Sequence, residues 1–114
     1  MGSRPAAKQR FATEVAIGTL LKDYKANEIR ADGLYKGKDV RVAGKLIAAK
    51  KGLAGGMYVT LGTGAAFEMP ALQCSLRSSQ EERAASLSKG DSVTVEGTVS
   101  GLMGNVQASD CIIN

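Results

Sequence analysis

Five short segments of this chain alternate apolar and polar residues, which is the pattern of strands with one buried face. The clearest is residues 92–99, where Val93, Val95 and Val99 occupy alternate positions and Gly97 completes the series. Such short strands cannot bury their apolar faces separately. We therefore expect them to curl on one another into a small closed barrel, which leaves no open edge. The five segments are residues 39–49, 57–62, 71–76, 92–99 and 106–114.

A helix is expected before the first strand. Thr13 is suited to cap it, and apolar residues then recur at helical spacing. The glycines and aspartates of residues 30–39 predict that the helix stops near residues 27–30. The apolar stripe of this helix comprises Ile17, Leu20, Leu21 and Tyr24.

A second, shorter helix is expected between the third and fourth strands. Ser78 and Glu81 have the spacing of a capping box, with Ser79 and Glu82 as an alternative frame. A helix in this position of a five-stranded barrel is the arrangement of an OB-fold. We therefore predict a mainly β fold with helices, namely an OB-fold barrel with an N-terminal helix and a short helix between strands three and four.

The length of 114 residues suits a single domain with one hydrophobic core. We assign residues 13–114 to the OB-fold domain and residues 1–12 to a flexible leading segment. The start Met1-Gly2-Ser3 resembles residues added for expression, so the lack of an export signal carries little information. No apolar run approaches the roughly 20 residues of a transmembrane span.

Two local features fit a tightly curved barrel. Gly44 in the first strand and Gly97 in the fourth stand where a curved strand has no room for a side chain. In the last strand, Ala108 and Cys111 are out of phase with each other. A bulge at Ser109-Asp110 would bring both to the inner face.

The composition argues against catalysis. The chain has no histidine, which removes the commonest general base and the commonest metal ligand. Two cysteines without further ligands cannot build a zinc site, and no phosphate-binding or nucleophile motif occurs. We therefore expect no enzyme activity, no metal and no cofactor.

Charge is distributed unevenly along the chain. Residues 1–51 hold 12 Lys/Arg against 5 Asp/Glu, whereas residues 52–114 hold 3 against 6. A basic half can serve an anionic partner, or it can be an ordinary solvated surface. Charge alone leaves both interpretations open.

The stretch LLKDYKANEIRADGLYKGKDVRVAGKL resembles the bacterial tRNA-anti-like OB-fold family, whose pattern is Y-x-x-N-E-x-x-A-D-x-x-Y-x-G-K followed by a V-x-G strand. The resemblance covers roughly residues 15–114. It implies an OB-fold, an exported, periplasmic or lipoprotein location, and the nucleic-acid binding for which the family is named. It brings no established functional residues, and we expect the motif's polar residues to tie the helix to the first strand. The matching residues are Tyr24, Asn27, Glu28, Ala31, Asp32, Tyr35, Gly37, Lys38, Val42 and Gly44.

Ligands of OB-folds usually lie on the outer face of strands two and three. Basic side chains beside an aromatic platform there would hold single-stranded DNA or RNA. Only one aromatic residue, Tyr58, falls on the predicted face, so we expect weak, salt-sensitive binding; a plain solvated face is the alternative. The candidate residues are Tyr58, Thr60, Gln73 and Ser75, with Arg41, Lys45, Lys50 and Lys51 beside them.

A second hypothesis is a protein-interaction or scaffold module of the cell envelope. Leu53, Leu102 and Met103 stand in two glycine-rich turns, where they either pack over the barrel ends or offer an apolar lip to a protein partner. Recognition of a small ligand or an oligosaccharide is a third possibility.

Cys74 and Cys111 are expected on neighbouring strands, both facing inward if the bulge is present. A disulfide between them would fit an exported protein, and two reduced core thiols are the alternative.

Overall fold

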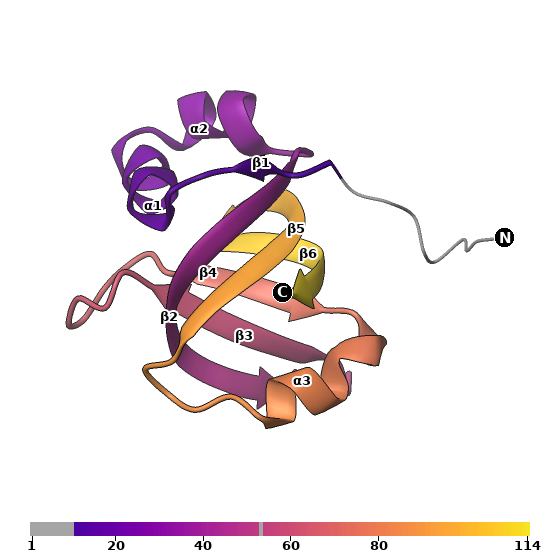
Figure 1. Cartoon of the computed structure of the whole chain (residues 1–114). Helices are drawn as coiled ribbons and strands as arrows, with labels where there is room; N and C mark the ends of the chain where they lie inside the picture. Colours follow the sequence, from indigo (N-terminus) through magenta and orange to yellow (C-terminus); the bar gives the residue numbers. More distant parts are fainter. Residues whose placement is uncertain (1–10, 53) are drawn as a thin grey trace, which may run out of the picture.

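The computed structural model describes residues 11–52 and 54–114 (Figure 1). Residues 1–10 of the predicted leading segment, and Leu53, lie outside the described residues. The elements in chain order are β1 (Thr13–Glu14), α1 (Ile17–Ala26), α2 (Glu28–Tyr35), β2 (Asp39–Lys51), β3 (Met57–Gly62), β4 (Leu72–Leu76), the 3-10 helix η2 (Ser78–Gln80), α3 (Glu81–Ala85), β5 (Ser92–Met103) and β6 (Asn105–Ile113).

Five of the strands form a closed barrel in the order β2-β3-β4-β6-β5, and β5 returns to β2. Closure depends on β2, whose 13 residues serve two neighbours: residues 39–45 pair with β5 and residues 45–51 pair with β3. All contacts between neighbours are antiparallel except that of β4 with β6. The predicted OB-fold barrel, with α3 between its third and fourth strands, is confirmed.

The inner wall of the barrel carries the alternating apolar residues. Val93, Val95 and Val99 are buried as the pattern of β5 requires, and Val59 and Leu61 of β3 face them across the core. Helices α1 and α2 cover one end of the barrel, while α3 lies toward the other (Figure 1). From α1, the buried side chains of Ile17, Leu20, Leu21 and Tyr24 complete the core.

The two predicted glycine positions are sites of close approach. A Cβ at Gly44 would lie 2.7 Å from Ile17 Cδ1 and 3.0 Å from the carbonyl oxygen of Gly62. A Cβ at Gly97 would collide with the Sγ atom of Cys111. Both strands therefore need a residue without a side chain, because a core at native density cannot absorb the extra carbon without strain.

The predicted bulge in β6 is confirmed. Thr98 of β5 is opposite Ser109, but Glu96 is opposite Ile112, so β6 contains one more residue than β5 over this stretch. Asp110, within the bulge, has a φ of 55°. As a result Cys111 faces inward and is buried.

The start of the domain differs from the prediction. Thr13 does not cap a helix: it forms β1 with Glu14, and this pair lies parallel to Val40 and Arg41 of β2. Helix α1 begins only at Ile17, and its N-cap residue Ala16 offers no side-chain hydrogen bond. The local sequence could not predict β1, because a strand of two residues is defined only by its pairing with another strand, here β2.

The predicted turn over residues 30–39 is largely helical instead. Helix α2 spans Glu28–Tyr35 and starts at Asn27, whose Oδ1 accepts a hydrogen bond from the backbone N of Arg30 at 3.0 Å. This cap supplies the first turn of a helix whose sequence, with Asp32 and Gly33, is a poor helix former.

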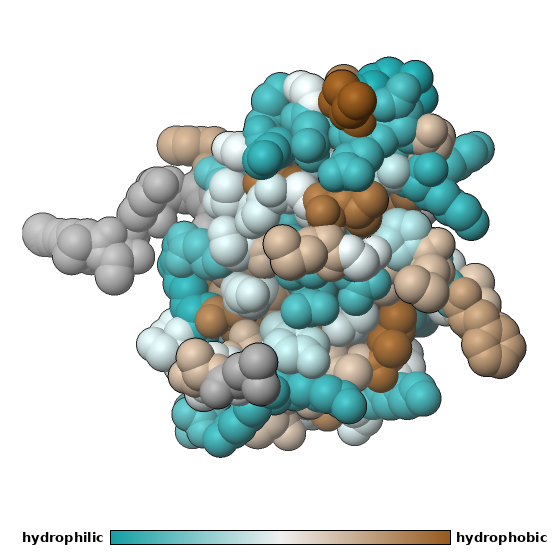
Figure 2. All heavy atoms as spheres, turned by 180° about the vertical axis from the view of Figure 1, so that it is seen from behind, coloured by the Kyte–Doolittle hydropathy of each residue, from teal (hydrophilic) through white to brown (hydrophobic). Residues whose placement is uncertain are grey.

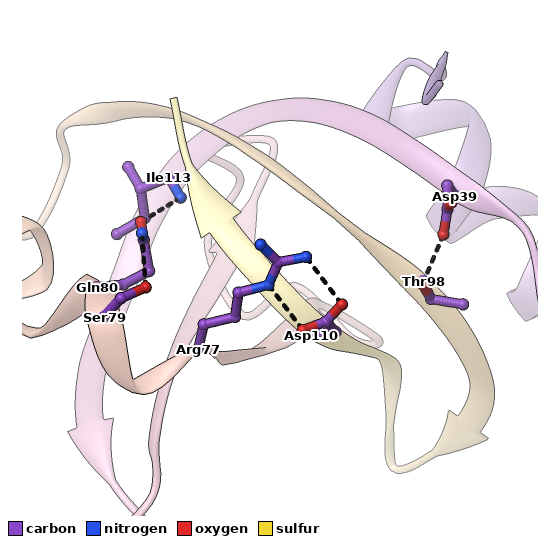
Figure 3. Close-up of polar contacts among 7 residues, drawn as sticks. All are labelled: Asp39, Arg77, Ser79, Gln80, Thr98, Asp110 and Ile113. Carbon is purple, nitrogen blue, oxygen red and sulfur yellow. Dashed lines mark hydrogen bonds and ion pairs between the residues drawn. The ribbon is translucent and has the colours of Figure 1, made fainter. Parts of the chain in front are cut away.

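The capping box predicted near Ser78 and Glu81 is absent, since neither η2 nor α3 has a side-chain cap. Side chains fix this connection to β6 instead (Figure 3): Arg77 Nε and Nη2 donate to the two carboxylate oxygens of Asp110 at 2.7 and 3.0 Å. Gln80 Oε1 accepts a hydrogen bond from the backbone N of Ile113 at 2.8 Å. These contacts join the segment that follows β4 to β6, the strand that pairs with β4 in parallel.

Candidate functional site

The outer face of β3 and β4 brings together most of the residues proposed from the sequence. In the pairing of β2, β3 and β4, Lys50 is opposite Tyr58, and Tyr58 is opposite Ser75. Thr60 is opposite Gln73 in the next outward row. Cross-strand partners share a face of the sheet, so these five side chains form one outer surface.

Tyr58 lies between two hollows of this surface. One has a volume of about 540 Å³ and is lined by Lys51, Tyr58, Gln73 and Ser75 together with the turn after β2. The other, of about 210 Å³, lies between Tyr58 and helix α3. We call the two hollows together the Tyr58 groove.

The side chain of Tyr58 is half-buried, and its hydroxyl has no hydrogen bond to any residue in the described ranges 11–52 and 54–114. Lys50 and Lys51 both line the hollow next to α3, where Glu81 is the acidic neighbour. The groove therefore offers a half-buried aromatic ring with two ammonium groups and one carboxylate beside it.

Amide side chains border the groove on the β6 side. The Gln73 Oε1 atom is 3.5 Å from Asn105 Nδ2, and Asn105 Oδ1 accepts a hydrogen bond from the backbone N of Ala71 at 3.0 Å. Gln107 is opposite Gln73 across the parallel pairing. Sequence reasoning missed Asn105 and Gln107, although the alternation of the last strand already indicated that Gln107 faces outward.

Arg41 does not join this surface. It lies opposite Glu96 on the half of β2 that pairs with β5, and its Nη2 atom is 2.7 Å from Glu96 Oε2. Glu14 Oε2 is 3.6 Å from its Nη1 atom. The hydrogen bond and the charge of Glu96 raise the pKa of Arg41 above its usual value. This arginine is engaged within the fold, tying β1 and β5 to β2.

Lys45 also lies apart from the Tyr58 groove. Its Nζ atom donates to Ser92 Oγ at 2.8 Å, and its side chain borders a different hollow, next to the loop between β3 and β4.

The proposed apolar lip is only partly exposed. Leu102 packs against the hydrophobic core, whereas the side chain of Met103 is 80% exposed at the turn between β5 and β6. Leu53, the third member, is outside the described residues.

Cys74 and Cys111 are free thiols in this structure and both are fully buried. Hydrogen bonding with Cys111, together with burial, raises the pKa of Cys74 well above its usual value. The two cysteines lie on neighbouring strands and face inward, as the sequence predicted. A disulfide between them stays a prediction.

Neither a metal site nor a membrane-spanning helix is found among residues 11–52 and 54–114. No group of three or more His, Cys, Asp or Glu side chains within residues 11–52 and 54–114 is arranged to hold a metal ion. In that same part of the chain, no helix has the length and apolar character needed to cross a membrane.

The sequence matches the tRNA_anti-like family over residues 3–112. The chain belongs to the tRNA_anti-like family. No curated protein matches the sequence.

Solved structures agree with this assignment at the level of the fold. A proposed nucleic acid-binding lipoprotein from Klebsiella pneumoniae superposes with a TM-score of 0.72 at 21% identity, covering 90% of this chain and 92% of that one. A proposed aspartyl-tRNA synthetase from Leishmania major gives a TM-score of 0.58 at 11% identity, covering 99% of this chain but 22% of that one.

The tyrosines of the tRNA_anti-like motif join helix α1 to helix α2, and not the helix to the first strand as the sequence predicted. Tyr24 of α1 donates to Asp32 of α2 at 2.8 Å, and Tyr35 of α2 donates back to Asp23 of α1 at 2.6 Å. Burial, and then the bond to Asp23, raises the pKa of Tyr35 to about 12; burial and Asp32 raise that of Tyr24 in the same way. These two reciprocal bonds, which we call the helix lock, join α1 and α2 over the barrel.

Proposed function

We propose that this tRNA_anti-like domain is a non-enzymatic module that binds single-stranded nucleic acid in the Tyr58 groove. The observation that carries the proposal is Tyr58 itself: a half-exposed ring, without a hydrogen-bond partner among the described residues, between two hollows and next to Lys50 and Lys51. A base would stack on the ring, while phosphates would lie against the two ammonium groups.

The chemistry of the groove favours a sequence-tolerant binder. Every base has a face that can stack, and lysines recognise phosphates without reading sequence. Gln73 is the one amide that lines the larger hollow, so any base preference would come from it. The description of the Klebsiella protein as nucleic acid-binding is consistent with this proposal.

Binding should be weak in the groove alone. One stacked base contributes about 1–3 kcal/mol. Glu81 lines the same hollow as Lys50 and Lys51 and opposes phosphate binding there. Because the rest of the affinity comes from the contacts of Lys50 and Lys51 with phosphates, it should fall as the salt concentration rises.

The test is fluorescence anisotropy with labelled oligothymidylate and oligouridylate over a salt series. The Lys50→Ala/Lys51→Ala variant should bind less tightly, and the slope of log K against log salt should fall by about 1.4, at about 0.7 per lost phosphate contact. The matched control is Lys36→Ala/Lys38→Ala, which removes two exposed charges from the segment between α2 and β2 and touches neither hollow of the Tyr58 groove. Absence of binding at low salt, or equal losses in both variants, would reject the groove.

We further propose that the natural protein is exported. The likeness to a Klebsiella protein described as a lipoprotein supports this location, and a disulfide between Cys74 and Cys111 would agree with it. Cell fractionation of the natural protein tests the proposal, and recovery with the cytosolic fraction would reject it. Thiol titration of the denatured, unreduced protein tests the disulfide, because two free thiols would exclude it.

A further inference from the structure

The loop between β3 and β4 displays an aromatic side chain to solvent. Phe67 is fully exposed, and its φ of 54° falls in the left-handed region that bulky residues rarely adopt. Met69, two residues on, is 70% exposed. In Figure 2 this loop forms an apolar projection at the edge of the molecule. Exposing a phenylalanine in a strained conformation gains no stability for the isolated domain.

The shape of this loop is fixed by its own side chains. Glu68 accepts hydrogen bonds from the backbone N and from the hydroxyl of Thr63, both at 2.7 Å. The Thr63 hydroxyl is in turn 3.4 Å from the backbone N of Ala65. Strained residues persist where the surroundings hold them, and they are concentrated at functional sites. Thr63 and Glu68 thus hold the loop that displays Phe67 to solvent.

A hollow of about 610 Å³ lies under this loop, between it and the connection that leads into β5. Ile47 and Phe67 supply its apolar wall, and Lys45 and Lys89 supply its basic groups. The acidic residue that lines the hollow is Glu68, whose carboxylate is bound to Thr63. We call this site the Phe67 hollow.

The Phe67 hollow and the Tyr58 groove lie on the same outer face. Lys45 is opposite Gly62, and Lys50 is opposite Tyr58, on the ribbon that β2 and β3 form. Tyr58, Thr60 and Gly62 are alternate residues of β3 and so point to one side. Four residues of strand separate the two sites at β3, which corresponds to about 13 Å.

We propose that the Phe67 hollow is a second subsite for the same nucleic-acid strand, with a base stacked on Phe67 and phosphate against Lys45 and Lys89. The inference rests on the proposed function and extends it along the outer face of β3. Continuity of the face, the Phe67 ring and the ammonium groups of Lys45 and Lys89 favour a polyanion that carries flat rings. Glu68 opposes phosphate binding there, as Glu81 does in the Tyr58 groove. The ring of Phe67 also supplies a second aromatic platform for stacking, in addition to that of Tyr58.

The test compares two strand lengths on the whole chain. The shorter strand is a thymidylate dinucleotide, whose one internucleotide step is shorter than the distance between the two subsites, and the longer is an oligothymidylate of about 12 nucleotides, within the range of site sizes seen for OB-folds. The shorter strand reaches one subsite, and the longer one reaches both. Tyr58→Ala should weaken binding of both strands. Phe67→Ala should weaken binding of the longer strand about tenfold, the effect of losing one stacked base, and leave the shorter strand unchanged.

Two further variants make the result specific. Met69→Ala removes a neighbouring exposed apolar side chain that does not line the hollow, and it should leave both affinities unchanged. Lys89→Ala should reduce the salt slope for the longer strand by about 0.7 and leave that of the shorter strand as it was. Because Phe67 is fully exposed, its variant should unfold at the wild-type temperature.

Failure of the second subsite can be distinguished from failure of the proposed function. If Phe67→Ala binds the longer strand as the wild type does while Tyr58→Ala weakens both, the second subsite is wrong and the proposed function stands. If neither strand binds the wild type, both proposals fall together. If Phe67→Ala loses binding to vesicles of anionic phosphatidylglycerol and not to the strands, the loop is a membrane contact and the subsite is again wrong.

Discussion

Tyrosine side chains have different surroundings at the helical end of this barrel and on its outer face near α3. At the helical end, Tyr24 and Tyr35 each donate a hydrogen bond to an aspartate of the other helix, and Tyr24 is almost completely buried. On the outer face near α3, Tyr58 is half-buried and its hydroxyl has no hydrogen bond within the described part of the chain. The residue type is the same, but its surroundings are not.

This difference separates residues that hold the fold from residues that are available to a ligand. The family motif contains both locked tyrosines, so a motif search alone would select the two that are already engaged. Tyr58 lies outside that motif, and the alternation of its strand, which places it on the outer face, made it a candidate. The structure adds the two hollows beside it.

The largest expected effect is on stability at the helical end. Tyr24→Ala should lower the free energy of unfolding by about 3–5 kcal/mol, because it empties a buried aromatic site. It also leaves Asp32 without its donor. Urea unfolding followed by circular dichroism measures the loss. A loss below about 1 kcal/mol, the size of a single hydrogen bond, would show that Tyr24 does not anchor the helices.

Tyr58→Ala should show the opposite profile. Its effect on unfolding should stay within about 1 kcal/mol, since the side chain is only half-buried, whereas nucleic-acid binding should weaken by about 1–3 kcal/mol. Tyr58→Phe keeps the ring and should bind as the wild type does. Equal losses for the alanine and phenylalanine variants would indicate a role for the hydroxyl instead of stacking.

The contribution of the helix lock to the free energy of unfolding can be measured separately from that of side-chain burial. Tyr35→Phe should cost about 1 kcal/mol of unfolding free energy, the typical value of one hydrogen bond. In a double-mutant cycle with Asp23→Ala, which removes the acceptor, the two losses should not add, because both substitutions break the same contact. Additive losses would mean that the two residues act independently.

The same bond predicts a pH dependence. Below about pH 10, Tyr35 is protonated in both the folded and the unfolded chain, and the bond contributes fully. Because its pKa is raised to about 12 in the fold, stability should fall as the pH rises from about 10 to about 12. Tyr35→Phe should show a smaller fall over this interval. Identical slopes for the two proteins would contradict the raised pKa.

The smallest expected effect is electrostatic. Glu81→Gln removes the acidic neighbour of Lys50 and Lys51, and it should strengthen nucleic-acid binding by a few tenths of a kcal/mol at low salt. Glu82→Gln, on the same helix but not on the wall of the hollow, is the control. The difference between the variants should vanish at high salt.

The sequence was sufficient to predict the barrel because its signals are local and repeated. Alternation located all five barrel strands, and the out-of-phase Cys111 located the bulge opposite Gly97. The same alternation placed Tyr58, Thr60, Gln73 and Ser75 on one face, since outward positions follow directly from inward ones.

What the sequence could not show depends on partners far along the chain. The short β1 exists only because β2 lies beside it, and α2 is stabilised by bonds from α1 that no local propensity encodes. Arg41 was a candidate phosphate ligand until its register opposite Glu96 was known. Phe67 reads as an ordinary loop residue in the sequence, and only its exposure and φ value distinguish it.

The parallel pairing of β4 with β6 has a consequence for how this protein is made. Because β6 follows β5 in the sequence and lies between β4 and β5, the ring has two unpaired edges until β6 has been synthesised. Such edges are templates for association with other chains. A nascent or truncated chain ending before Asn105 should therefore depend on chaperones, whereas addition of β6 removes both edges in one step.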